Sequence, residues 1–251
     1  MTAFSFISMI FVVSGLVSCL IIFMDTRKHK QPMTIMGAVW PLTGLWASWA
    51  GLWAYYRFGR AKKAMDGSMP GMDMDSMPDM DMSHQAPPMQ MDKGNMDNMI
   101  PPSPTWQQIS LSTLHCGAGC TLADLAGEWF TFFIPLSIGS SLIAGQWVFD
   151  YLLALATGIL FQYLAIRQME NLPARQILKK AFKADVLSLT SWQIGMYGWM
   201  AIVIFLFSNG LSFPKTSWEF WFMMQIAMLL GFITAYPVNR LLIKKGIKKG
   251  M

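Results

Sequence analysis

Charged residues are scarce in this chain, at 13% of its 251 residues, about half the share of a typical soluble domain. Apolar residues take their place, at 54% of the sequence. Histidine and cysteine are rare as well, with three of each, which leaves few ligands for haem or for histidine-based dinuclear sites. The sequence contains no phosphate-binding loop, no Ser-His-Asp order, no HExxH and no dinucleotide fingerprint. The class that remains is a membrane protein.

Six stretches are long and apolar enough to span, since about 20 residues cross a hydrocarbon core of about 30 Å. They are residues 3–24, 33–56, 122–144, 147–166, 186–208 and 218–241. Helices are expected because lipid offers no partner to free backbone groups, and the alternating segments of a membrane barrel are missing from the sequence. We therefore predict an all-α membrane protein of about six transmembrane helices.

Composition divides the chain into three parts. We predict a two-helix transmembrane hairpin over residues 1–63, a polar linker over 64–103 and a four-helix transmembrane domain over 104–251. The second apolar stretch carries glycines at intervals of seven residues, which let helices pack closely in lipid: Gly37, Gly44 and Gly51. Pro41 lies in the same stretch and predicts a kink.

Lys and Arg near helix ends mark the cytoplasmic side of a membrane protein. With six spans, fourteen of them fall on one side: Arg57, Arg60, Lys62, Lys63, Arg167, Arg175, Lys179, Lys180, Lys183, Arg240, Lys244, Lys245, Lys248 and Lys249. Four fall on the other: Arg27, Lys28, Lys30 and Lys215. We therefore predict a multi-pass protein of the bacterial cytoplasmic membrane, with both termini and the linker in the cytoplasm. These clusters hold helix ends at anionic lipid and do not indicate nucleic-acid binding.

The linker is rich in methionine and aspartate, with eleven of the chain's 23 Met and seven Asp in residues 65–99. Such a composition cannot bury a core, so we expect disorder. Thioethers suit soft ions such as Cu(I) or Ag(I), and the candidate ligands are Met72, Met74, Met77, Met80, Met82 and His84. The alternative is a low-complexity insertion without a ligand. Cytosolic thiols outcompete thioethers for Cu(I), which conflicts with the predicted cytoplasmic placement.

The sharpest motif, His-Cys-Gly-Ala-Gly-Cys at residues 115–120, opens the third apolar stretch. On a helix, a spacing of four residues would place four ionisable side chains on one face: Cys116, Cys120, Asp124 and Glu128. Ionisable residues inside a bilayer are costly and mark sites or pathways. The two glycines also allow a bent loop that folds His115 and both thiols around one ion. Such a donor set suits Cu(I) or Zn(II).

Other interpretations of these residues stay open. Cys116 and Cys120 could form a redox pair, although a C-x3-C spacing is not the C-x-x-C of redox helices and lies at the edge of disulfide geometry. They could equally be small buried residues, with the two carboxyl groups bonding locally. Two methionine pairs at helical spacing fit a soft-ion path, although this spacing is more often packing: Met196 with Met200 and Met224 with Met228.

The motif, with Asp124, Gly127 and Glu128 after it, resembles a family of small bacterial integral membrane domains of unknown function marked by H-C-G-x-G-C. The resemblance covers about residues 104–247 and implies four spans. The hairpin before them resembles an N-terminal extension that some members carry, here followed by the Met-rich insertion. The family implies a link to copper or heavy-metal handling, and no residue roles beyond the motif.

The sequence thus predicts a membrane protein that binds, and transports or hands over, a soft metal ion. Cu(I) is the first candidate, with silver or zinc as alternatives. Expected partners are the lipid bilayer, the ion and a copper ATPase or metallochaperone, and an oligomer is left open. Metal handling is favoured over catalysis. The alternatives are a membrane thiol-disulfide or quinone-linked oxidoreductase and a non-catalytic assembly subunit.

Overall fold

The computed structural model describes residues 2–29, 31, 33–60, 104–169, 172–207 and 213–248. Its helices are α1 (Ala3–Lys28), α2 (Met36–Ala54), α3 (Trp106–Phe133), α4 (Leu142–Met169), α5 (Ala174–Ile202) and α6 (Trp218–Lys244). Two π-helical segments, η1 (Tyr55–Gly59) and η4 (Val203–Phe207), extend α2 and α5. The predicted all-α class is confirmed, and four helices are long and apolar enough to cross a membrane: α1, α4, α5 and α6. The disorder predicted for 64–103 lies outside the described residues.

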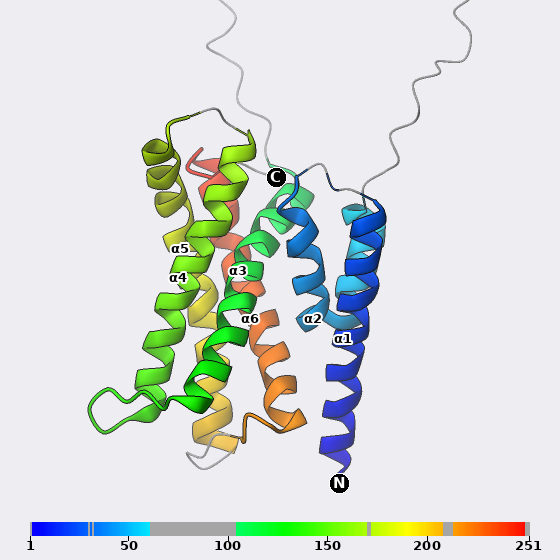
Figure 1. The fold of residues 1–251 in the computed structure, drawn as a ribbon, viewed down its shortest axis with the longest axis vertical. Helices are drawn as coiled ribbons and strands as arrows, with labels where there is room; N and C mark the ends of the chain where they lie inside the picture. Colours follow the sequence, from blue (N-terminus) through cyan, green and yellow to red (C-terminus); the bar gives the residue numbers. More distant parts are fainter. Residues whose placement is uncertain are drawn as a thin grey trace, which may run out of the picture. The chain divides into compact units, whose positions relative to one another are not determined.

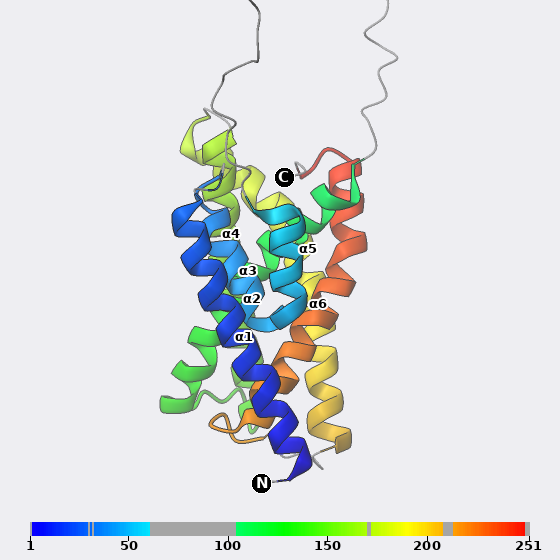
Figure 2. The same ribbon diagram turned by 90° about the vertical axis from the view of Figure 1, so that its right-hand side faces the viewer.

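The chain reverses its direction within α2. The ring centroids of Trp40 and Tyr55 lie 5.5 Å apart, whereas fifteen residues of straight helix would separate these residues by about 22 Å. The reversal falls at Ser48, whose φ of 47° and ψ of −124° interrupt the helix. Figure 2 shows α2 descending beside α1 and the following residues rising back. A re-entrant helical hairpin therefore replaces the straight span predicted over residues 33–56.

Neighbouring helices supply hydrogen bonds to the turn of this hairpin. The Ser48 hydroxyl donates to the carbonyl oxygen of Phe11 in α1, at 3.3 Å. The side-chain amide of Gln225 in α6 donates to the carbonyl oxygen of Leu45, at 2.9 Å. An unpaired backbone group in lipid costs several kcal/mol, so irregular backbone at membrane depth occurs only where protein covers it. These contacts are what allow the chain to turn back at this depth.

α1 and α6 run in the same direction. At their first turns, Ser5 hydrogen-bonds to Glu219. At the far end of α1, Asp25 accepts hydrogen bonds from Tyr55 at 2.7 Å and from Arg60 at 2.9 Å, which ties the end of η1 to the end of α1. Because the hairpin returns to this end, α1 begins opposite to the place where α6 ends (Figure 1). The prediction of both ends on one side is at odds with this arrangement, and the side of the membrane on which each end lies stays a prediction.

The reversal also gathers the basic residues. Thirteen of the Lys and Arg residues in the described part lie in or just after the last turns of α1, η1, α4 and α6 or in the first three turns of α5: Arg27, Lys28, Arg57, Arg60, Arg167, Arg175, Lys179, Lys180, Lys183, Arg240, Lys244, Lys245 and Lys248. We call this the basic end. The opposite end carries Lys215 alone among the described Lys and Arg residues. Arg27 and Lys28, which the predicted six-span topology assigned to the other side, thus lie with the other basic residues.

α3 lies among the other helices, in contact with α2, α4, α5 and α6. It starts at Trp106 behind a capping box in which Thr105 and Gln108 exchange hydrogen bonds. It ends at Phe133, and the next residues form an exposed loop with a turn at Gly139. The third apolar stretch, predicted over 122–144, therefore covers only the second half of the helix. The His-Cys motif lies inside the helix rather than at its opening.

Candidate functional site

The helical arrangement of the motif is the one that the structure shows. α3 continues without interruption through both glycines, so the alternative of a bent loop is wrong. The four side chains of the spacing share a buried face, and each is at most 5% exposed: Cys116, Cys120, Asp124 and Glu128. From the first to the last, this face covers about 18 Å along the helix axis. We call these four side chains the ladder.

The first half of the ladder, nearer the basic end, contains the two thiols. Cys116 and Cys120 are free and adjacent to one another. Cys116 also lies next to Asp185 of α5, a fully buried side chain whose oxygens accept no hydrogen bond from nitrogen or hydroxyl. His115 is 1% exposed, packs edge-on against Phe161, and has both ring nitrogens unpartnered. Several buried polar atoms without partners thus surround the thiols.

The glycines of the motif serve close packing. A side-chain carbon at Gly117 would meet the indole ring of Trp192. At Gly119 it would lie 3.0 Å from the Cα atom of Gly158 in α4. Gly158 in turn leaves room for the carboxylate of Asp185. The two glycines between the cysteines therefore allow close contacts with Trp192 and with α4, and the thiol half is tightly packed.

The second half of the ladder carries carboxyl groups, one of which pairs with a lysine. Lys215, which precedes α6, forms an ion pair with Glu128 at 2.7 Å and donates to Thr131 at 2.7 Å. The side-chain amide of Gln146 in α4 donates to the same Glu128 oxygen at 2.6 Å. Asp150 of α4 is 2% exposed and fits into the space left by Gly127. This half is thus an acidic cluster with a single close ion pair.

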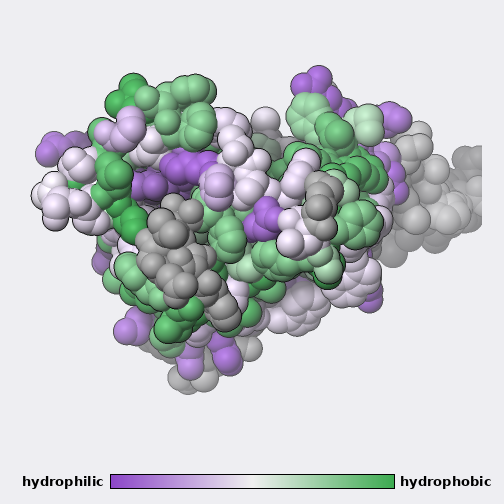
Figure 3. Space-filling model, turned by 90° about the horizontal axis from the view of Figure 1, so that it is seen from below, coloured by the Kyte–Doolittle hydropathy of each residue, from purple (hydrophilic) through white to green (hydrophobic). Residues whose placement is uncertain are grey.

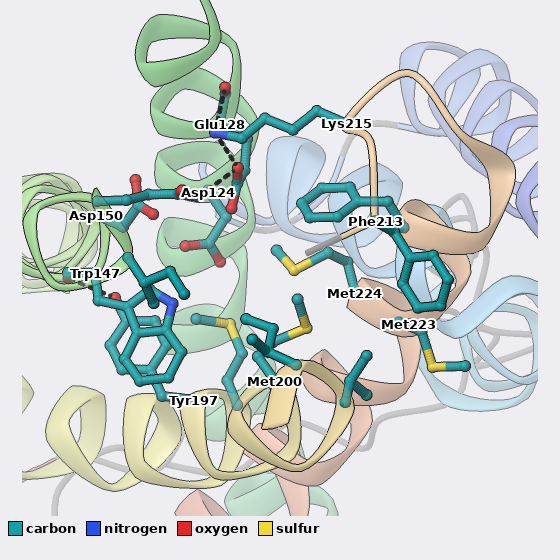
Figure 4. A pocket seen from close by; sticks show the side chains of 16 residues that line it. Asp124, Glu128, Trp147, Asp150, Tyr197, Met200, Phe213, Lys215, Met223 and Met224 are labelled. Carbon is teal, nitrogen blue, oxygen red and sulfur yellow. Dashed lines mark hydrogen bonds and ion pairs between the residues drawn. The ribbon is translucent and has the colours of Figure 1, made fainter. Parts of the chain in front are cut away.

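A cavity of about 40 Å³ opens beside these carboxyl groups, and a water molecule needs roughly 10–15 Å³. Its polar lining is Asp124, Glu128, Gln146, Asp150, Tyr197 and Lys215, and its sulfur lining is Met196, Met200, Met223 and Met224. Figure 4 shows the Asp124 side chain and Met224 facing the same space, with Lys215 reaching toward Glu128. Three of the four methionines paired by helical spacing therefore line one cavity. Met228 lines a separate apolar groove instead.

At the basic end, the last of the buried polar side chains along α3 is a lysine. Lys248 is 2% exposed, and its ammonium group donates to Asn239 at 2.9 Å and to the carbonyl oxygen of Ser112 at 3.4 Å. Asn239 is bonded to Ser188 of α5 at 3.0 Å. A series of buried polar groups thus extends along α3, with Lys248 at one end and Lys215 at the other. We call this series the polar track.

The structure brings together only part of the predicted site. The ladder spreads its donors along the helix axis, and no group of three or more His, Cys, Asp or Glu side chains in the described part could hold a metal ion. The linker candidates all lie outside the described residues: Met72, Met74, Met77, Met80, Met82 and His84. Metal ligation by His115, Cys116, Cys120, Asp124 and Glu128 stays a prediction. So does a redox role of the cysteines.

Sequence reasoning missed the partners that other helices supply. Asp150 and Asp185 each lie near the start of an apolar stretch, where the sequence alone indicates a residue at the membrane interface. Both are nevertheless buried beside α3. Lys215 and Lys248 counted only toward topology. The one available signal was the carboxyl group itself, since an acidic residue next to a membrane span is rare enough to examine.

Fold and site together define a helical membrane protein in which a polar track runs through the packed interior. Residues 105–248, which include α3 to α6, match a family described as a domain of unknown function (DUF4396), and the chain belongs to this family. No curated protein and no solved structure shows significant similarity to the chain. Membership agrees with the predicted resemblance to a family of unknown function, whereas H-C-G-x-G-C as its signature stays a prediction.

Proposed function

We propose that the protein binds a soft metal cation, foremost Cu(I), and passes it along the buried face of α3. The observation that carries this proposal is the ladder. Cys116, Cys120, Asp124 and Glu128 follow one another at single-turn intervals inside a helix that four other helices cover. Such groups are expensive in a bilayer and are kept where they serve a site or a pathway. Cu(I) or Ag(I) is the cargo, with Zn(II) as a further candidate for the thiols.

The donor types favour a soft ion. Thiolates and thioethers select Cu(I) over hard cations, and the thiols of α3 are followed along the track by the methionines of α5 and α6. A thiol that binds Cu(I) must release its proton. The Asp185 carboxylate lies next to the Cys116 thiol and accepts no hydrogen bond from nitrogen or hydroxyl, so it can accept that proton. With one thiolate bound to Cu(I) and the proton on Asp185, the first station then carries no net charge.

Positively charged loops stay inside, so we propose that the basic end of the unit lies in the cytoplasm at a bacterial inner membrane. Arg60 and Pro104, the described residues on either side of the Met-rich linker, belong to this end through the Arg60–Asp25 ion pair and the start of α3. The linker would then collect the ion on the cytoplasmic side. Because cellular thiols compete there, we propose delivery from a metallochaperone or exchange with a copper ATPase.

Copper binding to purified protein tests the proposal. The background is the full-length chain with the eleven methionines of residues 65–99 changed to serine and with His84→Gln, which silences the linker without shortening the chain. In the presence of a Cu(I) chelator that outcompetes thioethers, we expect about one Cu(I) per protein. Cys116→Ser together with Cys120→Ser should reduce this to less than a tenth.

Cys19→Ser is the matched control, because it removes the third thiol of the chain, half-buried in α1 and away from the ladder. It should leave the copper content unchanged. Equal copper in the Cys116→Ser, Cys120→Ser variant and in its parent would overturn the proposed site. A reversible disulfide between these two cysteines in place of bound copper would favour the oxidoreductase alternative.

A further inference from the structure

We propose that the cavity beside the carboxyl half of the ladder is itself a soft-metal site. In this site the thioethers of Met196, Met200 and Met224 and the carboxylate of Asp124 hold Cu(I) or Ag(I). The inference deepens the proposed function and rests on it, because it assigns a second station to the same path. It stands on a different set of side chains, so it can be tested apart from the thiols.

The three methionines belong to the hydrophobic core and also border an open space. Methionine usually fills irregular gaps in a core. Here Met196 of α5 is 1% exposed, and Met200 of α5 and Met224 of α6 are 7% exposed, and yet they border an open volume of about 40 Å³. Their neighbours across this volume are Asp124 and Asp150 rather than aliphatic side chains alone. Sulfur from two helices thus converges on carboxylate from two others.

Unpaired acceptors mark the same cavity. One oxygen of Asp124 and one of Asp150 have no hydrogen-bond partner, although the two residues are only 3% and 2% exposed. Lys215 is the one Lys or Arg among the residues that line the cavity, and it is paired with Glu128. A buried acceptor without a partner is destabilising. A bound monovalent cation would satisfy these acceptors in a cavity that is lined by three acidic side chains and one lysine.

The oxygen atoms of the cavity that could act as metal ligands are too few for a hard cation. Hard cations such as Mg²⁺ or Ca²⁺ take six or more oxygen ligands. The Tyr197 hydroxyl is committed to the carbonyl oxygen of Trp147 at 3.0 Å, and the Gln146 amide nitrogen to Glu128. What is left is mainly thioether sulfur and the free carboxylate oxygens. That mixture, with low coordination number, suits Cu(I) and Ag(I).

Position along the path supports the assignment. Asp124 lies one helical turn beyond Cys120, a rise of about 6 Å, and it borders both this cavity and the apolar groove next to it. An ion released by the thiols would therefore meet Asp124 first and the thioethers next. Thioethers are neutral and hold Cu(I) less tightly than thiolates do, so the ion would leave the second station more easily than the first.

Ag(I) binding tests the second station without the thiols or the linker. The starting protein is the full-length chain with the linker silenced as above and with Cys19→Ser, Cys116→Ser and Cys120→Ser. We expect it to bind about one Ag(I), measured by titration and by metal analysis after gel filtration. Met196→Leu, Met200→Leu and Met224→Leu together should lower the bound Ag(I) to less than a tenth. Leucine keeps the side-chain volume close to that of methionine.

Met228→Leu is the matched control, since Met228 is equally buried in α6, one turn beyond Met224, but does not line the cavity. Asp124→Asn, which keeps the shape of the side chain, should weaken Ag(I) binding about tenfold and checks the site without any change of methionine. Ag(I) bound equally by the leucine variant, or no Ag(I) bound by the thiol-free parent, would overturn the second station. In both cases, copper retained by the thiols would leave the proposed function standing.

Discussion

The two halves of the α3 ladder accommodate their buried polar groups in different ways. The thiol half is closed: glycines at 117 and 119 draw the indole of Trp192 and the backbone of α4 against the helix. The carboxyl half is open: it borders a cavity, and a lysine from outside the helix pairs with Glu128. The difference is that the first half depends on packing for its stability and the second on charge balance.

Viewed from the Lys215 end, hydrophilic residues lie among mostly apolar and weakly polar side chains (Figure 3). The basic end carries most of the charge of the unit, so the two ends of the track differ as its two halves do. The proposed path of the cation thus connects a strongly basic end of the unit with a less charged one. The following substitutions test this difference between the halves, in order of decreasing expected effect on stability.

Removal of the Lys215 ammonium group from the carboxyl half should have the largest effect on stability. Lys215→Met leaves Glu128 without its ion pair, and the loss of one partner of a buried pair costs about 3–5 kcal/mol. We expect a loss of about 3 kcal/mol in the free energy of unfolding, measured by denaturation in detergent. Adding Glu128→Gln should restore part of it. A single variant as stable as the parent would show that charge balance does not hold this half together.

Crowding of the thiol half should have the next largest effect. In Gly119→Ala the new methyl group would lie 3.0 Å from the Gly158 Cα atom, so α3 and α4 must separate. Overpacking of this kind costs about 1–3 kcal/mol. Gly198→Ala in α5 is the control, because no atom lies within 4 Å of its new carbon, and it should stabilise by roughly 0.5–1 kcal/mol. Equal unfolding temperatures for both variants would contradict the account of a closed half.

Exchange of sulfur for oxygen in the thiol half should have the smallest effect on stability. Cys120→Ser keeps the size of the side chain and adds one buried hydroxyl, which we expect to cost about 1 kcal/mol. Copper retention in the presence of chelator should nevertheless fall at least tenfold. The two measurements on one variant separate packing from chemistry. A variant that loses both stability and copper in proportion would point to a purely structural cysteine.

The ladder was predictable from sequence because its geometry is local. A spacing of four residues fixes one face of a helix, and the structure has Cys116, Cys120, Asp124 and Glu128 on that face. Their partners were not predictable, because Asp185, Asp150 and the two lysines arrive from other helices. The spacing of residues along the chain does not predict which of these partners contacts which side chain of the ladder.

The re-entrant hairpin shows the same limit in the fold. Pro41 predicted a kink in the second apolar stretch, and yet the helix continues past it and breaks at Ser48. The turn depends on Gln225, 180 residues further along the chain, which donates to the Leu45 carbonyl. Hydropathy reports only that a stretch is apolar. The misplaced basic residues after α1 were the one sequence signal that the simple up-and-down topology was incorrect.

The central claim, passage of a soft cation along α3, is tested most directly by flux into vesicles. Protein reconstituted in liposomes that contain a Cu(I) indicator should admit copper supplied as a Cu(I) complex. Cys116→Ser with Cys120→Ser should lower the initial rate at least tenfold, whereas Gly198→Ala should leave it unchanged. Entry no faster than in protein-free vesicles, or equal entry through the thiol variant and its parent, would contradict the account.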